Sequence, residues 1–134
     1  MEVRDAVETD AHPLAELSGA PLDVLRNLIH DRTVRVAEAE GGGPPLGFVS
    51  FDASPGTVYV TQLSGSAPVL ERLLAEPLRF AANESMAVEL LVAEEDATIR
   101  TVADEVGFQE AGPGPRFDGV QTLHYRFVPE DAGP

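Results

Sequence analysis

Three strand-like segments follow one another in the middle of the chain, and the breaks between them are too rich in Gly and Pro to hold a helix. The segments are residues 34–39, 46–51 and 57–63. The first break contains a Gly-Gly-Gly-Pro-Pro run, and the second contains Ser54-Pro55-Gly56, a turn sequence. Strands joined by such connections pair antiparallel, so this part of the chain predicts a three-stranded antiparallel meander.

Helical patterns precede the meander. Residues 2–7 predict a short opening strand, after which Thr9 or Asp10 can cap a helix that Ser18-Gly19 ends. Pro21 is well placed to begin a second helix. Its apolar face is formed by Leu22, Leu25, Leu28 and Ile29.

Strands and helices alternate after the meander. An apolar stripe over residues 69–81 predicts the longest helix, and Pro77 within it predicts a bend or a break into two short helices. Asp96 can cap a later helix that Gly107 ends. The remaining expectations are a buried strand at 87–92, a short strand at 108–111, a Gly/Pro loop at 112–115 and a last strand at 120–128.

The predicted order is therefore β-α-α-β-β-β-α-β-α-β-β, which belongs to the α/β class. The length of 134 residues suits one domain, which we place at residues 1–129, followed by a loose tail at 130–134.

Charge restricts the partners of the chain. Asp and Glu number 23 against nine basic residues, all of them Arg, and the net charge is −14. A surface without a basic patch repels nucleic acid and anionic membranes. The carboxylates are spread along the chain, which favours a protein adapted to molar salt, where charges are screened over about 3 Å. We interpret the chain as a halophile-type acidic protein.

Features that the sequence lacks exclude further classes of site and of protein. The sequence has no Cys, so disulfides, thiolate metal sites and Cys nucleophiles are excluded, and its three His lie too far apart to predict a metal site. No apolar run approaches the roughly 18 residues of a membrane span, and the first residues lack a signal-peptide pattern. We therefore expect a cytoplasmic location.

The element order and several short segments resemble the GNAT family of acyl-CoA-dependent N-acyltransferases over nearly the whole chain. Val3-Arg4-Asp5-Ala6 with Thr9-Asp10-Ala11 is similar to the opening strand and helix start of the family. Pro45-Leu46-Gly47-Phe48-Val49 is similar to its third strand, and Val106-Gly107-Phe108 to the end of its last helix. The resemblance implies a strongly bent mixed sheet with helices on both faces.

The family's acyl-CoA motif is Gln or Arg, two residues, Gly, one residue, then Gly or Ala. The corresponding residues here are Gln62, Leu63, Ser64, Gly65, Ser66 and Ala67. The resemblance implies that the backbone at Thr61–Leu63 orients the thioester of acetyl-CoA. It also implies that amides at 65–67 bind the diphosphate, as helix N-termini bind anions. The alternative is an ordinary loop and helix cap, and Pro68 removes one N–H from such a cradle.

Catalytic groups are fewer. The Tyr that often protonates the departing thiolate in this family corresponds to Ala103, so Tyr59, Tyr125, Ser64 or a water would have to replace it. Glu89 is the candidate base for the substrate amine. The alternatives to Glu89 are Glu38 and Glu40, and each of these carboxylates could instead be merely solvated.

Two further residues leave alternatives open. His124 points away from the face of Leu123 and Tyr125, so it is either structural or solvated, or it reaches a pocket. Arg116 could hold a substrate carboxylate or pair with local acids.

The resemblance implies transfer of an acyl group, most simply acetyl, from acetyl-CoA to a small-molecule or peptide primary amine. Glu89 and Tyr59 are the candidate catalytic residues, and no metal takes part. The rival hypothesis is a catalytically silent GNAT-like module that binds a partner or regulatory ligand, with a homodimer as one possibility.

Overall fold

The computed structural model describes residues 1–129, and they form one seven-stranded sheet flanked by four α-helices. The strands are β1 (Glu2–Asp5), β2 (Thr33–Glu38), β3 (Pro45–Ser54), β4 (Thr57–Ser64), β5 (Ala87–Ala93), β6 (Gln109–Phe117) and β7 (Val120–Phe127). The helices are α1 (Ala11–Ser18), α2 (Leu22–Asp31), α3 (Ala67–Asn83) and α4 (Ala97–Val106), and a short 3₁₀ helix covers Glu8–Asp10. The predicted α/β order is confirmed.

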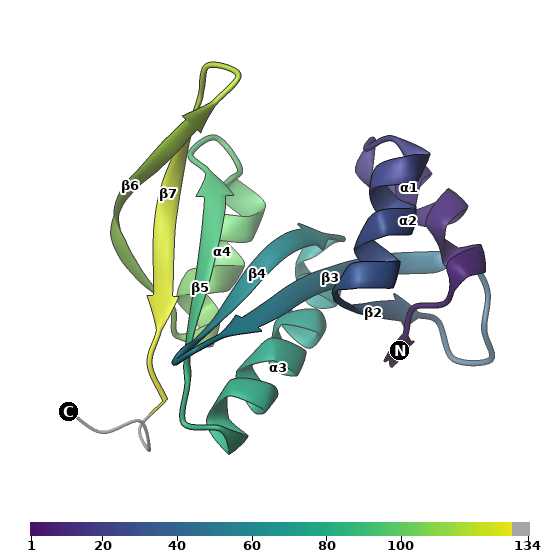
Figure 1. Cartoon of the computed structure of the whole chain (residues 1–134), viewed down its shortest axis with the longest axis horizontal. Helices are drawn as coiled ribbons and strands as arrows, with labels where there is room; N and C mark the ends of the chain where they lie inside the picture. The colour runs from purple at the N-terminus through teal and green to yellow at the C-terminus, as the bar shows by residue number, and fades with distance from the viewer. Residues whose placement is uncertain (130–134) are drawn as a thin grey trace.

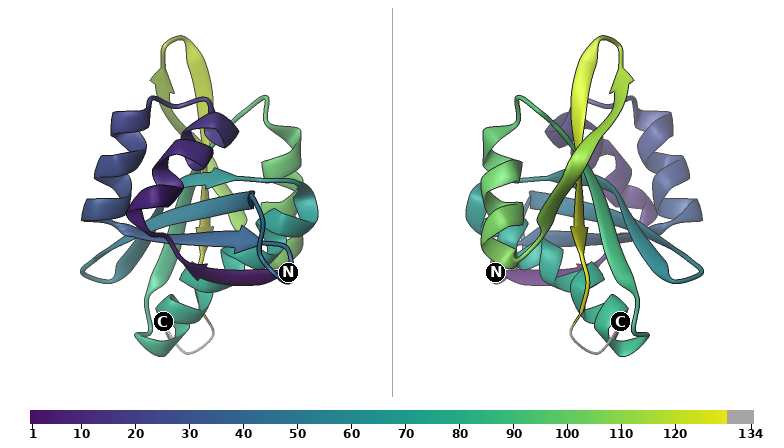
Figure 2. Two further views of the ribbon diagram at one scale, coloured as in Figure 1. Left: turned by 90° about the vertical axis from the view of Figure 1, so that its right-hand side faces the viewer. Right: turned by 90° about the vertical axis from the view of Figure 1, so that its left-hand side faces the viewer.

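The sheet order is β1-β2-β3-β4-β5-β7-β6, and every neighbouring pair is antiparallel except β4 and β5. Parallel strands require a crossover connection, which α3 supplies here. The sheet is strongly twisted, so that the β6–β7 end runs across the direction of β2–β4 (Figure 1; Figure 2). The meander predicted from the turn sequences corresponds to β2–β4.

Helices lie on both faces of the sheet, as expected, and two apolar cores result. The larger core lies between α3, α4 and the sheet and includes Leu73, Val88 and Val102. The smaller core joins α1 and α2 to β2 and β3 through Leu14, Leu25, Val34, Val36 and Phe48. One face is therefore covered along much of its length, whereas α1 and α2 cover only part of the other (Figure 1).

Helix ends follow their local sequence. Gly19 and Gly107 end α1 and α4 in the left-handed conformation, with φ of 77° and 107°. The Asp96 carboxylate accepts a hydrogen bond from the Ile99 N–H at 3.1 Å, so it caps α4 as predicted.

Of the two outcomes expected at Pro77, the break into two short helices is wrong, because α3 runs unbroken from Ala67 to Asn83. A proline within a helix costs about 3 kcal/mol. Buried apolar residues lie on both sides of Pro77, among them Leu73, Leu74 and Ala81. Their packing against the sheet outweighs the lost hydrogen bond.

The expected Gly/Pro loop at 112–115 is also wrong, because these residues lie within β6. β6 is an edge strand, where a proline needs no ladder partner on its outer side. Its pairing with β7 shifts register between Glu110 and Gly112 and again between Pro113 and Arg116. The irregular strand thus absorbs the residues that predicted a loop. The expected tail at 130–134 lies outside the described residues.

Candidate active site

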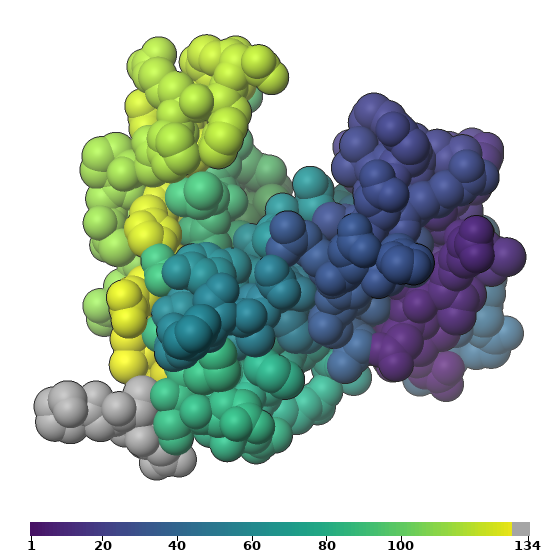
Figure 3. Space-filling view, in the orientation of Figure 1, coloured from purple at the N-terminus to yellow at the C-terminus, as the bar shows by residue number. Residues whose placement is uncertain are grey.

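The partly covered face of the sheet contains a large cavity. α1 and α2 pack over β2 and β3, and no helix in the described chain covers β4, β5 and β7 on the same side. The molecular surface is hollowed between the β6–β7 hairpin and the α1–α2 pair (Figure 3). The cavity measures about 820 Å³ and is lined by Tyr59, Val60, Thr61, Gln62, Glu89, Leu90, Leu91, Pro113, Gly114, Pro115, Phe117, Thr122 and His124.

Glu89 and His124 meet in this cavity. The carboxylate Oε1 of Glu89, on β5, contacts the ring Nε2 of His124, on β7. Only 14% of the Glu89 side chain is exposed, against 34% of His124. The cavity therefore contains an acid–base pair whose carboxylate is largely withdrawn from solvent.

Tyr59 lies beside this pair. Tyr59 on β4 is the register partner of Glu89 on β5, so both side chains project from the same face of the parallel strands. Tyr59 is exposed and lines the cavity. The two residues expected to be catalytic therefore lie together, and His124 joins them.

β4 bulges and then leaves β5. Ser50 pairs with Gln62 and Phe51 pairs with Val60, so Thr61 is an extra residue without an opposite partner on β3. The Thr61 hydroxyl lies 2.9 Å from the Ser50 hydroxyl, which ties the bulge to β3. Pairing between β4 and β5 ends at Val60 and Leu90, so the backbone from Thr61 to Leu63 has an edge that β5 does not cover.

A second cavity of about 170 Å³ occupies the divergence of β4 and β5. It is lined by Val60, Thr61, Gln62, Leu63, Leu90, Leu91, Val92, Ala93 and Ile99, none of which is ionisable. Residues 60–62 and 90–91 also line the large cavity, so the two spaces adjoin through the opening in the sheet.

The strand β4 leads into α3 through Gly65 and Ser66. Ser66 is the N-cap of α3, and the first helical hydrogen bond runs from Leu70 N–H to the Ser66 carbonyl. The N–H groups of Ala67 and Val69 precede that bond, whereas Pro68 has none. Ser66, Ala67 and Pro68 are exposed, so the first turn of α3 offers a small anion-binding surface.

Gly65 has a packing role as well. Its φ is 147°, and a Cβ there would lie 2.8 Å from Val69 Cγ1 and 3.4 Å from the Leu46 carbonyl oxygen. Gly47 is equally confined, because its Cβ would lie 2.3 Å from the Ser64 carbonyl oxygen. The two glycines let β3 approach the β4–α3 connection closely, so close packing alone already requires Gly65.

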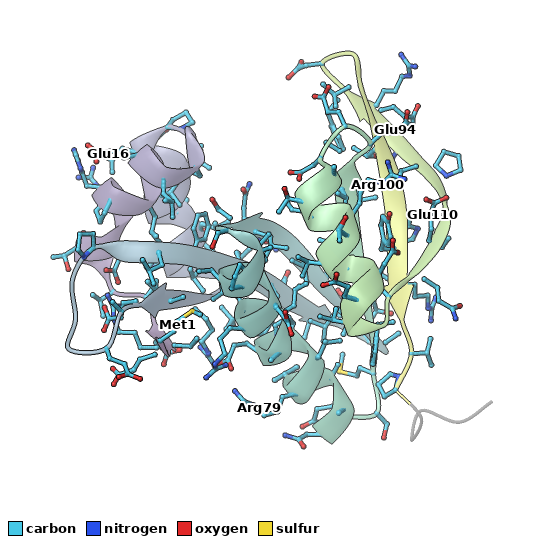
Figure 4. All side chains as sticks on the ribbon, turned by 180° about the vertical axis from the view of Figure 1, so that it is seen from behind. Met1, Glu16, Arg79, Glu94, Arg100 and Glu110 are labelled. Carbon is cyan, nitrogen blue, oxygen red and sulfur yellow. The ribbon has the colours of Figure 1, made fainter. Side chains whose placement is uncertain are left out.

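The structure gives no proton donor at the position that the resemblance indicated. Ala103 is fully buried in the core and does not line either cavity. Ile99, one turn earlier on α4, is the residue that borders the strand opening. The Tyr125 hydroxyl accepts a hydrogen bond from Arg100 Nε at 3.3 Å, and Tyr125 lies in the core beneath α4. Arg100 lies near Glu94 and Glu110, as Figure 4 shows.

Three other candidates lie away from the cavity. Glu38 contacts Arg4 Nε at 3.1 Å, and Glu40 lies 3.6 Å from the Met1 amine. Arg116 donates from Nε to Gln121 at 3.2 Å and does not line the cavity. Glu89 therefore remains the base candidate, and no arginine of residues 1–129 lines the cavity.

Sequence reasoning missed the partnership of His124. Strand alternation correctly placed its side chain opposite Leu123 and Tyr125. The pairing with Glu89 depends on the register of β5 and β7, in which Leu91 lies opposite His124. No local signal in the sequence reveals that register.

Solved structures share the complete architecture. A Desulfovibrio desulfuricans protein assigned to the GNAT family of acetyltransferases aligns over 95% of this chain and 98% of its own, with 16% identity and a TM-score of 0.76. A ribosomal-protein-alanine N-acetyltransferase from Brucella melitensis aligns over 96% and 99%, with 20% identity and a TM-score of 0.74. Arabidopsis thaliana NAA60, in complex with a bisubstrate analogue, aligns over 96% and 98%, with 11% identity and a TM-score of 0.78.

The chain therefore has the GNAT fold. No family model matches the sequence, and no curated protein matches it either. Within residues 1–129, no helix is both long enough and apolar enough to cross a membrane.

Proposed function

We propose that the chain is an N-acetyltransferase that moves an acetyl group from acetyl-CoA to a primary amine. The observation that carries the proposal is the opening between β4 and β5, which joins an exposed backbone edge to the Glu89–His124 pair. The Brucella neighbour is a ribosomal-protein-alanine N-acetyltransferase, and the Arabidopsis neighbour binds a bisubstrate analogue. Transfer to an amine is the chemistry that this fold favours.

The acetyl donor would be held by backbone groups. Along Thr61–Leu63 the strand has an edge that β5 does not cover, so the backbone N–H and C=O groups that point to this edge are available to the amide-rich arm of acetyl-CoA. The start of α3 would take the diphosphate through the amides of Gly65, Ser66 and Ala67, where the helix dipole favours negative charge.

The acceptor amine would enter from the large cavity. Its nitrogen attacks the thioester carbonyl, a C–N bond forms, the C–S bond breaks and CoA leaves as the thiolate. Glu89 and His124 together accept the proton that the amine loses, and Tyr59 borders the same space. A water would return a proton to the thiolate, because the described residues around the strand opening include no acid.

The absence of an acid at that opening favours the second candidate function, a silent GNAT-like binding module. The two candidates share ligand binding and differ in turnover. We therefore test binding and thiol release separately.

The binding test uses Ser66, because Gly65 is already required for packing. Asp and Asn are both good N-cap residues, so Ser66→Asp and Ser66→Asn should leave α3 intact. Only Asp places a negative charge beside the proposed diphosphate site. We expect Ser66→Asp to weaken acetyl-CoA binding at least about tenfold, as 1.4 kcal/mol of repulsion would do, and Ser66→Asn to bind like the wild type. A thermal-shift titration measures both, since ligand at 100 times its Kd adds about 2.7 kcal/mol.

The turnover test follows CoA thiol release with a panel of primary amines in 2 M KCl. Acetyl-CoA binding with amine-dependent thiol release supports the enzyme. Binding without release from any amine supports the silent module. Absence of binding in the wild type, or equal binding by both Ser66 variants, overturns the proposed donor site.

A further inference from the structure

We infer that the acceptor of the large cavity is a primary monoamine with an apolar body and no carboxylate. This inference rests on the proposed function and names the substrate class of the same site. It follows from the charge of the cavity and from the composition of its walls.

The cavity has a single carboxylate. Glu89 is the one acidic residue among those that line it in the described chain, and His124 is the one basic residue. An ammonium group can pair with Glu89, but a second ammonium, as in a diamine or an aminosugar, would be desolvated without a partner. The charge therefore favours a monoamine.

Within the described chain, a substrate carboxylate has no arginine partner in the cavity either. Arg116 donates to Gln121 and lies outside the cavity. Arg126 is the register partner of Glu89 but borders a different, smaller cavity. An amino acid would therefore place its carboxylate near Glu89 without any arginine to neutralise it.

The walls are apolar and open. Tyr59, Leu91 and Phe117 are 43%, 45% and 56% exposed, and all three line this cavity. Pro113 and Pro115 of β6 complete the apolar wall. Large apolar side chains gathered at one cavity mark a binding surface, and a volume of about 820 Å³ suits a small molecule. An apolar body would remove this surface from water while its amine reached Glu89.

The first experiment compares four probes by isothermal titration calorimetry, with and without saturating CoA. The reference probe is 2-phenylethylamine. Relative to it, 2-phenylethanol lacks the amine and phenylalanine carries a carboxylate, and 1,4-diaminobutane is a diamine. We expect 2-phenylethylamine to bind at least tenfold tighter than each of the others. Equal or tighter binding of phenylalanine or 1,4-diaminobutane, or no binding of 2-phenylethylamine, overturns the inference.

Variants of the wall supply the second experiment. Phe117→Ala should weaken 2-phenylethylamine binding at least threefold, whereas Leu17→Ala, which shortens an exposed apolar side chain of α1 outside the cavity, should leave it unchanged. Phe117→Glu adds a second carboxylate and should reverse the preference toward 1,4-diaminobutane. An unchanged preference in Phe117→Glu would mean that amines bind elsewhere and would overturn the inference.

The two proposals fail in different ways. Acetyl-CoA binding and thiol release judge the transferase, and they do not depend on which amine is preferred. Fast release with 1,4-diaminobutane and slow release with 2-phenylethylamine would leave the transferase standing and overturn the monoamine inference.

Discussion

The Nε2 atom of His124 contacts the Oε1 atom of Glu89 across the antiparallel pair of β5 and β7. The residues are diagonal neighbours, because His124 lies opposite Leu91 and Glu89 lies opposite Arg126. A carboxylate accepts the hydrogen that Nε2 carries, so Nδ1 becomes the basic ring nitrogen. Glu89 thus fixes the tautomer of His124, and the pair can accept a proton as a unit.

A double-mutant cycle tests this unit. We expect Glu89→Gln and His124→Gln each to lower kcat/KM for acetyl transfer about 100-fold, which is the scale of general-base assistance. The double variant should lose little more than the worse single variant, because residues that act together are not additive. Amine-dependent thiol release at pH 8 measures all three.

Glu105→Gln is the matched control, because Glu105 is an exposed residue of α4 that lines neither cavity. Its kcat/KM should equal that of the wild type. Losses that multiply in the double variant would show that Glu89 and His124 act independently.

The variant Ala103→Tyr tests whether a Tyr at position 103 could protonate the thiolate, as the resemblance implies, or would only overpack the core. The resemblance places the thiolate acid at position 103, but Ala103 is fully buried in the core between α4 and the sheet. Overpacking there should cost about 1–3 kcal/mol and should not increase thiol release. Urea unfolding and the thiol assay measure the two effects. A gain in turnover would show that a phenol at 103 does reach the leaving group.

The sequence predicted the architecture because the residues that begin and end its helices act locally. Gly19 and Gly107 ended helices and Asp96 began one, each through its own backbone conformation or hydrogen bond. The predictions at Pro77 and at Gly112–Pro115 were wrong because the surroundings decide whether a proline or glycine interrupts an element. Core packing keeps α3 intact at Pro77, and the edge position lets β6 include residues 112–115. The resemblance indicated Glu89, and Tyr59 was one of several substitutes for the missing acid; both line the cavity, and their catalytic roles stay predictions. His124 could not be found in this way, since its role depends on strand register.

Asp10 links the first strand to the helices on its face, and its pKa should control acid stability. Its carboxylate accepts from Arg4 Nη1 at 2.8 Å and Nη2 at 3.0 Å, and from the Val7 N–H at 2.8 Å. The hydrogen bonds from Arg4 lower the pKa of Asp10 in the folded state. A lowered pKa stabilises the fold above the unfolded value of about 3.9, and this contribution is lost as the pH falls through the folded pKa.

Asp10→Asn should therefore lower the free energy of unfolding by about 1 kcal/mol at pH 6, which is below the usual value for a charged hydrogen bond because Arg4 is 36% exposed and solvent screens the pair. The difference from the wild type should shrink as the pH falls below about 4. Urea unfolding at several pH values measures it, with the exposed Asp104→Asn as control. A difference that stays constant down to pH 2 would show that the stabilisation by Asp10 does not depend on its negative charge.

The acidic surface predicts a dependence on salt. With a net charge of −14, the carboxylates of the folded chain repel one another in dilute buffer. The screening length falls from about 10 Å at 0.1 M salt to about 3 Å at 1 M salt. We expect the Tm to rise between 0.05 M and 2 M KCl. Salt also strengthens apolar burial, so a rise alone does not identify the charges as its cause.

A variant with four fewer negative charges separates these effects. Glu71→Gln, Glu84→Gln, Asp104→Asn and Glu105→Gln change exposed residues that form no ion pair within the described chain. If repulsion among carboxylates limits stability, this variant should have the higher Tm at 0.05 M KCl and converge with the wild type at 2 M. Parallel salt curves for the two proteins would assign the rise to apolar burial and remove the support for adaptation to molar salt.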